Sequence, residues 1–492
     1  MTALLPVAIV LPMVGAAISV LLGRHPLLQR VVAVVAASGT LAVSVALLVV
    51  VDRDGTLSSP LGGWPSPLAI NLVADRLATL MLVIGSAMLL AVLVYALGQR
   101  ADDERSSWYI PTYLVLTAGV SAAFLAGDLF NLFVAIEILL MSSYVLITLE
   151  GNDDQIRSGT TYVVLNVLES SLLLMAVGLV FAATGTLNMA ELPERLAALP
   201  TGVRVGLNLL LLLAFGLKAA VFPLFSWLPD SYPAAPSPVT AVFAGLLTKI
   251  GLYALIRTQT LLFPGSMRTL LLVVAGFTMI VGVLGAIAQS DMKRILSFHI
   301  VSQIGYMLLG LALGGAAAIT ATIFYVLHHI PTKTSLFLVE GIIERDTGTS
   351  NLDRIGGLAR RSGPLALLFL LPALSLAGIP PFSGFIGKLG IVEAGFGQQE
   401  YTIIAVSLLG SLLTLVSMLK IWSGVFWGEP TPAPEGRAGV LRHHPLMSGV
   451  TAAVVVVCLV IALAAGPIYR FCGRAADSIL SPTQYTDSVV DK

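Results

Sequence analysis

The chain is dominated by apolar runs, each long enough to cross a lipid bilayer, that recur from one end to the other. A membrane-spanning helix needs roughly 20 such residues. Only 11% of the residues are charged, against about 25% in soluble proteins. We therefore predict an all-α polytopic membrane protein with about fourteen spans and exclude a water-soluble enzyme. The predicted spans are residues 3–22, 30–51, 76–98, 109–126, 129–149, 160–184, 205–222, 239–258, 268–288, 294–314, 317–340, 365–379 continuing as 382–396, 402–426 and 446–470.

The charge balance and the residue types limit which classes of partner and cofactor this chain can have. With 27 basic and 27 acidic residues, the chain has no net field that would attract nucleic acid. Two cysteines, Cys458 and Cys472, are too few for a disulfide framework or a four-ligand zinc site. The sequence contains no flavin, iron–sulfur or nucleotide motif. We expect no cofactor and no metal, and a lipid bilayer as the surroundings.

The chain is predicted to form a single membrane domain over residues 1–492, because the connections between spans are too short for a soluble domain. Segment 187–199 has the pattern of an amphipathic helix lying at the membrane interface. Residues 427–445 are predicted to be a Pro-bearing linker before the last helix at 446–470. Residues 473–492 are predicted to be a polar tail that does not pack.

The orientation in the membrane follows from the basic residues of the connections. Arginine and lysine are more frequent after odd-numbered spans than after even-numbered ones. The positive-inside rule then places the odd connections in the cytoplasm and both termini outside. The first span has no charged segment before it and is predicted to be an uncleaved helix.

The seven lysines and the twenty arginines are distributed differently. Lys293 and Lys492 are assigned to a connection and to the tail, and no arginine is placed deep in a span. The other five lysines fall inside predicted spans: Lys218, Lys249, Lys333, Lys388 and Lys420. Arginine would supply a fixed positive charge at least as well, whereas a buried lysine can lose its proton. This partition indicates a selection for titratable nitrogen at membrane depth.

Acidic side chains accompany these lysines. Glu137 lies near the middle of the fifth span and Glu169 inside the sixth. Each charged group in hydrocarbon costs at least roughly 2.5–3.5 kcal/mol, so such residues normally face a partner or a wet interior. Glu169 could equally well pair locally or carry protons, whereas Glu137 together with the central lysines indicates a proton relay.

Histidines are also placed within the spans. His299 is near the start of the tenth span, and His328 and His329 precede Lys333 in the eleventh. His329 and Lys333 are four residues apart and therefore neighbours on one helical face. Lys420, near the end of its span, could instead reach the headgroups.

Two spans carry prolines near the membrane centre. Pro223 interrupts the seventh and Pro380–Pro381 the twelfth, and proline frees backbone groups that only protein or a wet cavity can cover. Interrupted segments in corresponding positions of two halves point to an inverted-repeat transporter. We predict a first inverted repeat at 109–258 (spans 4–8) and a second at 268–426 (spans 9–13). Two unrelated kinks are the alternative.

Three segments resemble the antiporter-like subunits of respiratory complex I and of the Mrp multisubunit cation/proton antiporters. They are residues 216–257, 291–307 (DMKRILSFHIVSQIGYM) and 378–388 (GIPPFSGFIGK). Within that family, the runs GLLTKIGLYALIR and KTSLFL look most like the D subunit of the Mrp antiporters. The resemblance implies fourteen helices in two inverted five-helix repeats, with helices 7 and 12 broken, in a bacterial cytoplasmic membrane.

The resemblance also implies roles for individual residues. Glu137 matches the family's fifth-helix glutamate, which pairs with the lysine of the broken seventh helix, here Lys218. Lys249 matches the lysine at the centre of the eighth helix. Lys388 matches the terminal lysine of the broken twelfth helix.

A further group links the two halves in the family. Lys333 falls where the family carries a lysine or a histidine, and His328 and His329 precede it. Pro331 stands between them, where an aliphatic residue is expected. The resemblance therefore implies one relay along the membrane centre: Glu137, Lys218, Lys249, His328, His329, Lys333 and Lys388.

The predicted function is that of a proton-translocating subunit of a multisubunit Na+/H+ antiporter, working with the other membrane subunits of an Mrp complex. The alternative is a proton-pumping membrane subunit of an NADH–quinone oxidoreductase or a membrane-bound hydrogenase. Any redox centre would then belong to partner chains, so this chain is not expected to be an enzyme. A solute carrier is disfavoured because the lysines follow the membrane plane, and an inert scaffold because so many buried polar groups are costly.

Overall fold

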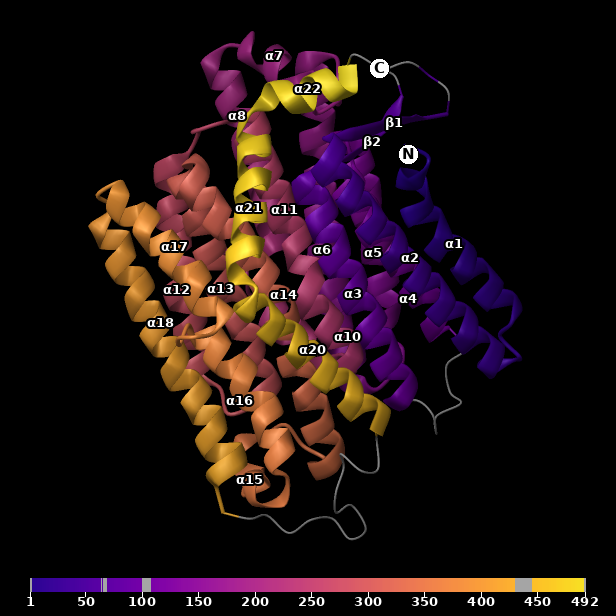
Figure 1. Cartoon of the computed structure of the whole chain (residues 1–492), viewed down its shortest axis with the longest axis vertical. Helices are drawn as coiled ribbons and strands as arrows, with labels where there is room; N and C mark the ends of the chain where they lie inside the picture. The colour runs from indigo at the N-terminus through magenta and orange to yellow at the C-terminus, as the bar shows by residue number, and fades with distance from the viewer. Residues whose placement is uncertain (1, 63, 65–68, 100–107, 430–444, 491–492) are drawn as a thin grey trace.

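The computed structural model describes residues 2–62, 64, 69–99, 108–429 and 445–490. Long helices run side by side through the molecule and form most of it (Figure 1). In the described part, eleven helices are long and apolar enough to cross a membrane, and two shorter apolar helices accompany them. The predicted all-α polytopic fold is confirmed.

Each predicted span has a helical counterpart. The counterparts are α1 (Leu4–Leu21), α2 (Pro26–Asp54), α3 (Arg76–Gln99), α4 (Tyr109–Leu125), α5 (Leu129–Ile147), α6 (Asp153–Thr184), α8 (Thr201–Ala219), the continuous run α10 (Ser237–Val242), η2 (Phe243–Leu247), α11 (Thr248–Arg257) and η3 (Thr258–Leu262), then α12 (Arg268–Ala288), α13 (Met292–Leu313), α14 (Gly315–Thr347), α16 (Gly363–Ala377) with α17 (Ser383–Gly397), α18 (Tyr401–Ile421) extended by η5 (Trp422–Trp427), and α20 (Pro445–Leu463). Pro331 lies inside α14 without ending it.

Short elements close the two ends of the bundle. The antiparallel strands β1 (Leu57–Leu61) and β2 (Ile70–Ala74) form a hairpin that hydropathy could not predict, because its strands are far shorter than a span. Helix α7 (Leu192–Ala197) falls within the predicted interfacial segment. Both lie at the same end as the start of α1, whereas α15 (Leu358–Arg361) lies at the opposite end (Figure 1). The 3₁₀ turns are η1 (Tyr232–Ala234) and η4 (Leu352–Arg354).

The seventh span is broken as predicted, and the backbone groups freed by the break are bonded. Helix α8 stops at Ala220, which has a positive φ of 58°, and a short helix α9 (Trp227–Ser231) follows. The Trp227 indole Nε1 donates to the carbonyl of Leu217 at 3.1 Å. The amide of Phe222 donates to Thr278 Oγ1 at 3.0 Å. The break is therefore tolerated at membrane depth because neighbouring protein groups cover it.

Two loops at opposite ends of the bundle are built alike, which accords with the predicted inverted repeats. Asp128 caps α5 and bridges to Asn188 after α6, and Asp291 caps α13 and bridges to Asn351 after α14. Both asparagines end a Thr-Gly-Thr-x-Asn sequence. In each copy the first threonine Oγ1 donates to the carbonyl of the second threonine at 2.9 Å. The loops occupy corresponding positions in the two predicted repeats, 109–258 and 268–426.

The C-terminal segment differs from the prediction. Instead of an unpacked polar tail, helices α21 (Ala465–Leu480) and α22 (Pro482–Val490) follow α20. Cys472, Ala475 and Ile479 on one face of α21 are buried against α14 and α3. Small apolar residues three or four apart make this amphipathic face, which a hydropathy count dominated by its charged residues overlooks. Of the predicted 427–445 linker, residues 430–444 lie outside the described part of the chain.

Candidate functional site

The buried lysine of the broken seventh span lies against the sixth. Lys218 occupies the last turn of α8, and its Nζ lies 3.4 Å from Glu169 Oε2 on α6. Both side chains are 1% exposed. Nζ also lies 3.5 Å from Asn166 Oδ1, one turn before Glu169. The lysine is thus held by a carboxylate and an amide inside the bundle.

The predicted partner of this lysine, Glu137, makes a different contact. Glu137 is half-buried on α5 and accepts a hydrogen bond from Ser170 on α6. The ion pair of Lys218 in this structure is formed with Glu169, so the predicted Glu137–Lys218 contact is corrected. Glu137 still lies beside the pair, since its charge acts on both partners. The sequence signal for Glu169 was its place inside an apolar span.

A glycine lets the eighth span approach this lysine closely. A Cβ added to Gly251 on α11 would lie 2.6 Å from the backbone N of Ala219 and 3.0 Å from Cβ of Lys218. Such distances are too short for any side chain, so glycine at this position brings α11 against the broken end of α8. This contact joins the helices that carry Lys218 and Lys249.

Lys249 lies just after a widened helical turn. Its side chain is fully buried, and Nζ donates to the carbonyl of Ala244 at 2.6 Å and to Thr248 Oγ1 at 3.1 Å. Ala244 belongs to the π-helical turn η2, a type of turn often found at functional sites. A cavity of about 10 Å³ beside Lys249, lined also by Tyr253, has space for about one water.

The eleventh span brings the next two groups together. Lys333 is fully buried on α14, and its Nζ donates to the carbonyl of Leu296 on α13 at 3.0 Å. His329, one turn earlier, is also fully buried, and neither ring nitrogen has a hydrogen-bond partner among the described residues. Lys249, Lys333 and Lys388 all act electrostatically on His329. His329 therefore lies near lysines of both predicted repeats.

His328 on α14 contacts the broken twelfth span. Its Nδ1 lies 2.9 Å from Ser383 Oγ, at the start of α17. Lys388, further along α17, donates to the carbonyls of Leu376 and Ala377 at 3.1 and 3.3 Å. These are the last carbonyls of α16, where the helix dipole is negative.

Lys388 also has neighbours on α13 and α18. Its Nζ donates to Ser411 Oγ at 3.0 Å and lies 4.5 Å from the centre of the Tyr306 ring. Further along these two helices, His299 Nε2 lies 2.9 Å from Ser417 Oγ and Gln303 Nε2 donates to Thr414 Oγ1 at 3.4 Å. Polar groups therefore line the α13–α18 contact.

Three of the central lysines have no acidic partner. Within the described part of the chain, Lys249, Lys333 and Lys388 form no ion pair with a carboxylate, and carbonyls, hydroxyls and an aromatic ring surround them instead. A buried ammonium without a counter-charge is costly, so these three lysines differ from Lys218, which Glu169 faces. Among the described residues no group of three or more His, Cys, Asp or Glu side chains could hold a metal ion.

Two basic residues lie deeper in the helices than the sequence predicts. The eighth span runs on to Leu262, so Arg257 lies buried within it and forms two bonds with Asp75, at 2.5 and 3.0 Å. Lys293 belongs to α13 and not to a connection, and its Nζ lies 2.7 Å from Glu344 Oε2. Both errors arose because the charged residues shortened the predicted spans.

Acidic groups at the ends of the bundle are perturbed in opposite directions. Burial alone would raise the pKa of Asp75, which precedes α3, but the Arg257 guanidinium holds it below its ordinary value. Burial raises the pKa of Asp128, the cap of α5, to about 6.

Lys420 is not extended to the headgroups: its Nζ donates to the carbonyls of Ile287 and Gln289 at 2.8 and 2.6 Å. Lys420 therefore serves to cap α12.

Comparison with known proteins places the chain in a family. Residues 126–414 match the family described as "NADH:quinone oxidoreductase/Mrp antiporter, TM". This range includes all seven predicted relay residues. The chain belongs to this family of membrane subunits.

Within the family, the chain is similar along its whole length to subunits of Mrp complexes. It is 43% identical over 486 residues to the D subunit of the Na(+)/H(+) antiporter of Alkalihalophilus pseudofirmus, and 98% of each chain is covered. A chain of the Mrp complex from Dietzia sp. DQ12-45-1b superposes with a TM-score of 0.93 at 33% identity, covering 100% of both chains. A chain of an archaeal membrane-bound sulfane sulfur reductase has a TM-score of 0.90 at 25% identity, covering 99% of this chain and 100% of that one.

Proposed function

We propose that this chain is the D-type, proton-translocating subunit of a multisubunit Na+/H+ antiporter in a bacterial cytoplasmic membrane. The observation that carries the proposal is the set of buried lysines and histidines that runs from α8 to α17. Lys218 is held by Glu169, whereas Lys249, Lys333 and Lys388 are surrounded by uncharged acceptors. A proton released at one end of such a set can be passed on because no member beyond Lys218 is fixed in its charged form by a carboxylate.

The attraction between Lys218 and Glu169 is similar in size to the free energy that the membrane potential supplies. The attraction between Lys218 and Glu169 at 3.4 Å is about 5 kcal/mol at an effective dielectric constant of about 20. Moving one charge through about 200 mV supplies about 4.6 kcal/mol. Separating Lys218 from its carboxylate is thus within the energy that the membrane potential provides. His329, beside Lys249 and Lys333, is the group through which the first and second halves exchange the proton.

The other subunits of the complex are the proposed partners, with protons and Na+ as the transported ions. Both termini are proposed to lie outside, and the end of the bundle where α10 and α13 begin then faces the cytoplasm. The apolar lateral surface of the helix bundle fits lipid and neighbouring membrane subunits.

The direct test is Lys218→Ala in the whole complex, expressed in cells that lack other antiporters. We expect growth in high sodium at alkaline pH, and Na+-dependent proton flux in everted membrane vesicles, to be lost while the complex still assembles. Full activity in this variant would refute the relay.

A proton-pumping subunit of a redox complex is the second candidate, since the likeness to the sulfane sulfur reductase chain extends over the full fold. The redox centre would then lie in other chains. Neighbouring genes distinguish the two: short hydrophobic antiporter subunits favour the first function, and quinone-oxidoreductase or hydrogenase subunits favour the second.

A further inference from the structure

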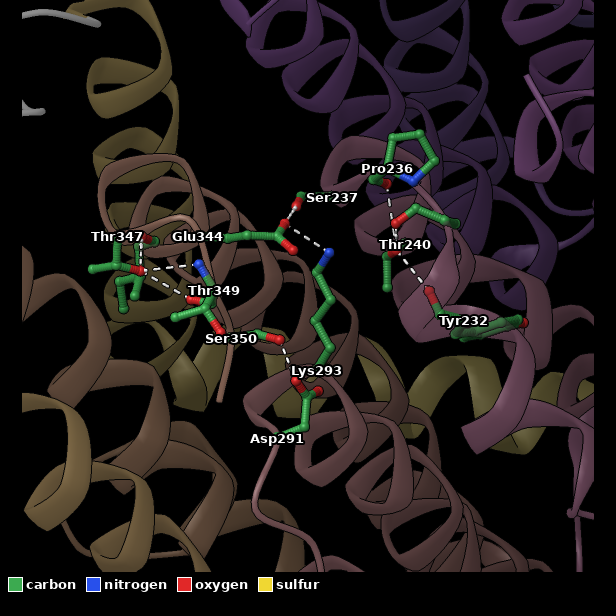
Figure 2. Close-up of polar contacts among 12 residues, drawn as sticks. Tyr232, Pro236, Ser237, Thr240, Asp291, Lys293, Glu344, Thr347, Thr349 and Ser350 are labelled. Carbon is green, nitrogen blue, oxygen red and sulfur yellow. Dashed lines mark hydrogen bonds and ion pairs between the residues drawn. The ribbon is translucent and has the colours of Figure 1, made fainter. Parts of the chain in front are cut away.

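A polar cluster lies at the end of the bundle where α10 and α13 begin and α14 ends (Figure 2). Lys293 Nζ lies 2.7 Å from Glu344 Oε2, and Ser237 Oγ donates to the same oxygen at 3.1 Å. The Glu344 side chain is 37% exposed, whereas that of Lys293 is 7% exposed. Glu344 therefore reaches the aqueous surface while its partners lie in the interior.

The next carboxylate inward, Glu340, has no such partners. It lies one turn before Glu344 on α14 and is fully buried. Neither of its carboxylate oxygens has a hydrogen-bond partner of standard geometry among the described residues, and the nearby Ser237 hydroxyl donates to Glu344 instead. Buried polar groups are nearly always bonded, and an ionisable residue within a membrane is by default a functional one.

The position of Glu340 on α14 directs it toward the central relay. His329, Lys333, Glu340 and Glu344 are spaced by four, seven and four residues, so they share one face of the helix. Seven residues of helix span about 10 Å. Helical side chains lean toward the N-terminus, so the carboxylate of Glu340 leans toward Lys333. The Lys333 side chain leans the other way and bonds the carbonyl of Leu296, so a proton passing between the two groups needs intervening water.

Helix α13 follows the same course beside α14. It carries Lys293 at the cluster, and one turn later Leu296, whose carbonyl accepts the hydrogen bond from Lys333. The cluster and the relay are thus joined along two adjacent helices.

The groups that face Glu340 come from several elements. Lys293 would attract a carboxylate at this position, and Glu344 and Asp291 would repel it. The Ser237 hydroxyl also faces it. On the side of α3, the Tyr95 hydroxyl donates to the carbonyl of Leu338 at 3.0 Å. Glu340 is therefore enclosed by one cation, two acids and hydroxyl groups, and not by lipid.

Gly341 keeps this enclosure tight. A Cβ at Gly341 would lie 2.6 Å from Ser237 Cβ and 2.8 Å from the Tyr95 hydroxyl. Only glycine therefore allows α14 to pack this closely on α10 and α3.

We propose that Glu340 is a proton-loading site of the antiporter subunit, through which protons pass between the surface carboxylate Glu344 and Lys333. The neutral carboxyl of Glu340 gives its proton, through intervening water, to the neutral amine of Lys333, leaving a carboxylate and an ammonium. The carboxylate then regains a proton from water by way of Glu344, whose ion pair with Lys293 opens to release it. This inference rests on the proposed function and assigns to the relay a connection with one membrane surface.

The test compares Glu340→Gln and Glu340→Asp in the whole complex with a control, Glu393→Gln on α17, whose side chain is exposed. In everted vesicles we expect Glu340→Gln to lower Na+-dependent proton flux about 100-fold. Glu340→Asp keeps a carboxyl and is expected to restore part of the flux with a shifted pH profile. Glu393→Gln is expected to match the wild-type protein.

Wild-type flux and pH profile in Glu340→Gln, with Lys218→Ala inactive in the same assay, would overturn the loading site and leave the proposed function intact. If Glu340→Gln fails to assemble, a hydrophobic carbodiimide applied to the wild-type complex decides the question, because it reacts with protonated carboxyl groups in apolar surroundings. We expect covalent modification of Glu340, detected by mass spectrometry, with parallel loss of flux. An unmodified Glu340 in an inhibited complex would overturn the proposal.

Discussion

Replacing Glu169 by glutamine removes the carboxylate that faces Lys218 without changing the size of the side chain. The pair is 3.4 Å apart and both side chains are 1% exposed, so solvent screens it little. At an effective dielectric constant of about 20 the attraction is about 5 kcal/mol, and breaking a buried pair typically costs about 3–5 kcal/mol. A loss of only half that attraction, about 2.5 kcal/mol, changes the charged fraction of Lys218 about 70-fold. We therefore expect Glu169→Gln to slow proton exchange by at least that factor.

The assay is Na+-dependent collapse of a proton gradient in everted vesicles that contain the assembled complex, followed with a pH-sensitive dye over a range of pH. Glu137→Gln is the matched variant, since Glu137 lies on the neighbouring helix and bonds Ser170 instead of Lys218. We expect the larger change in pH profile from Glu169→Gln. Wild-type exchange in Glu169→Gln, with the loss confined to Glu137→Gln, would refute the assignment of Glu169 as the partner of Lys218.

Three further predictions concern the framework around the relay. Asp75→Asn leaves the buried Arg257 without a counter-charge, which lowers the free energy of unfolding by about 3–5 kcal/mol. The thermal midpoint of the purified complex should therefore fall, and an unchanged midpoint would contradict this. Gly251→Ala places a Cβ 2.6 Å from backbone of α8, whereas Gly206→Ala meets nothing within 4 Å. Overpacking costs about 1–3 kcal/mol, so only the first should reduce the yield of assembled complex, and equal yields would argue against close α8–α11 packing. Burial raises the pKa of Asp128 from 3.8 to about 6, which favours its protonated form in the folded protein. Its contribution to stability is then full below 3.8 and lost as the pH rises through about 6, and Asp128→Asn should remove that part of the pH dependence of the thermal midpoint.

Hydropathy predicted the number and order of the spans because bilayer thickness imposes a length on every helix that crosses it. The sequence also predicts the helix breaks at the prolines, since proline cannot continue a helical hydrogen-bond ladder. The membership in the complex I and Mrp antiporter family, predicted from three motifs, is confirmed.

Helix ends and pairings were less accessible to sequence reasoning. Charged residues lower hydropathy whether or not they are buried, so Arg257 was placed at a span end and Lys293 in a connection, although both are buried in ion pairs. The packing of α21 was missed because its buried face is built from small residues.

The burial of the predicted relay lysines follows from the sequence, whereas the pairing of Lys218 does not. Lys218, Lys249, Lys333 and Lys388 all lie buried in the bundle, where the distribution of lysines placed them. The partner of Lys218 depends on the rotation of α5 and α6 about their axes. Spacing along one helix does not fix its rotation against another, so Glu169 could not be preferred to Glu137.

The central claim is that the buried lysines must be able to lose a proton and do not act as fixed charges. Lys249→Arg tests it most directly, with Lys420→Arg as the control, because Lys420 only caps backbone carbonyls. Proton flux is measured in everted vesicles at equal amounts of assembled complex. We predict that Lys249→Arg abolishes Na+-dependent flux, since arginine keeps its proton, while Lys420→Arg retains it. Equal flux in both variants would show that a permanent charge at Lys249 suffices and would contradict the relay.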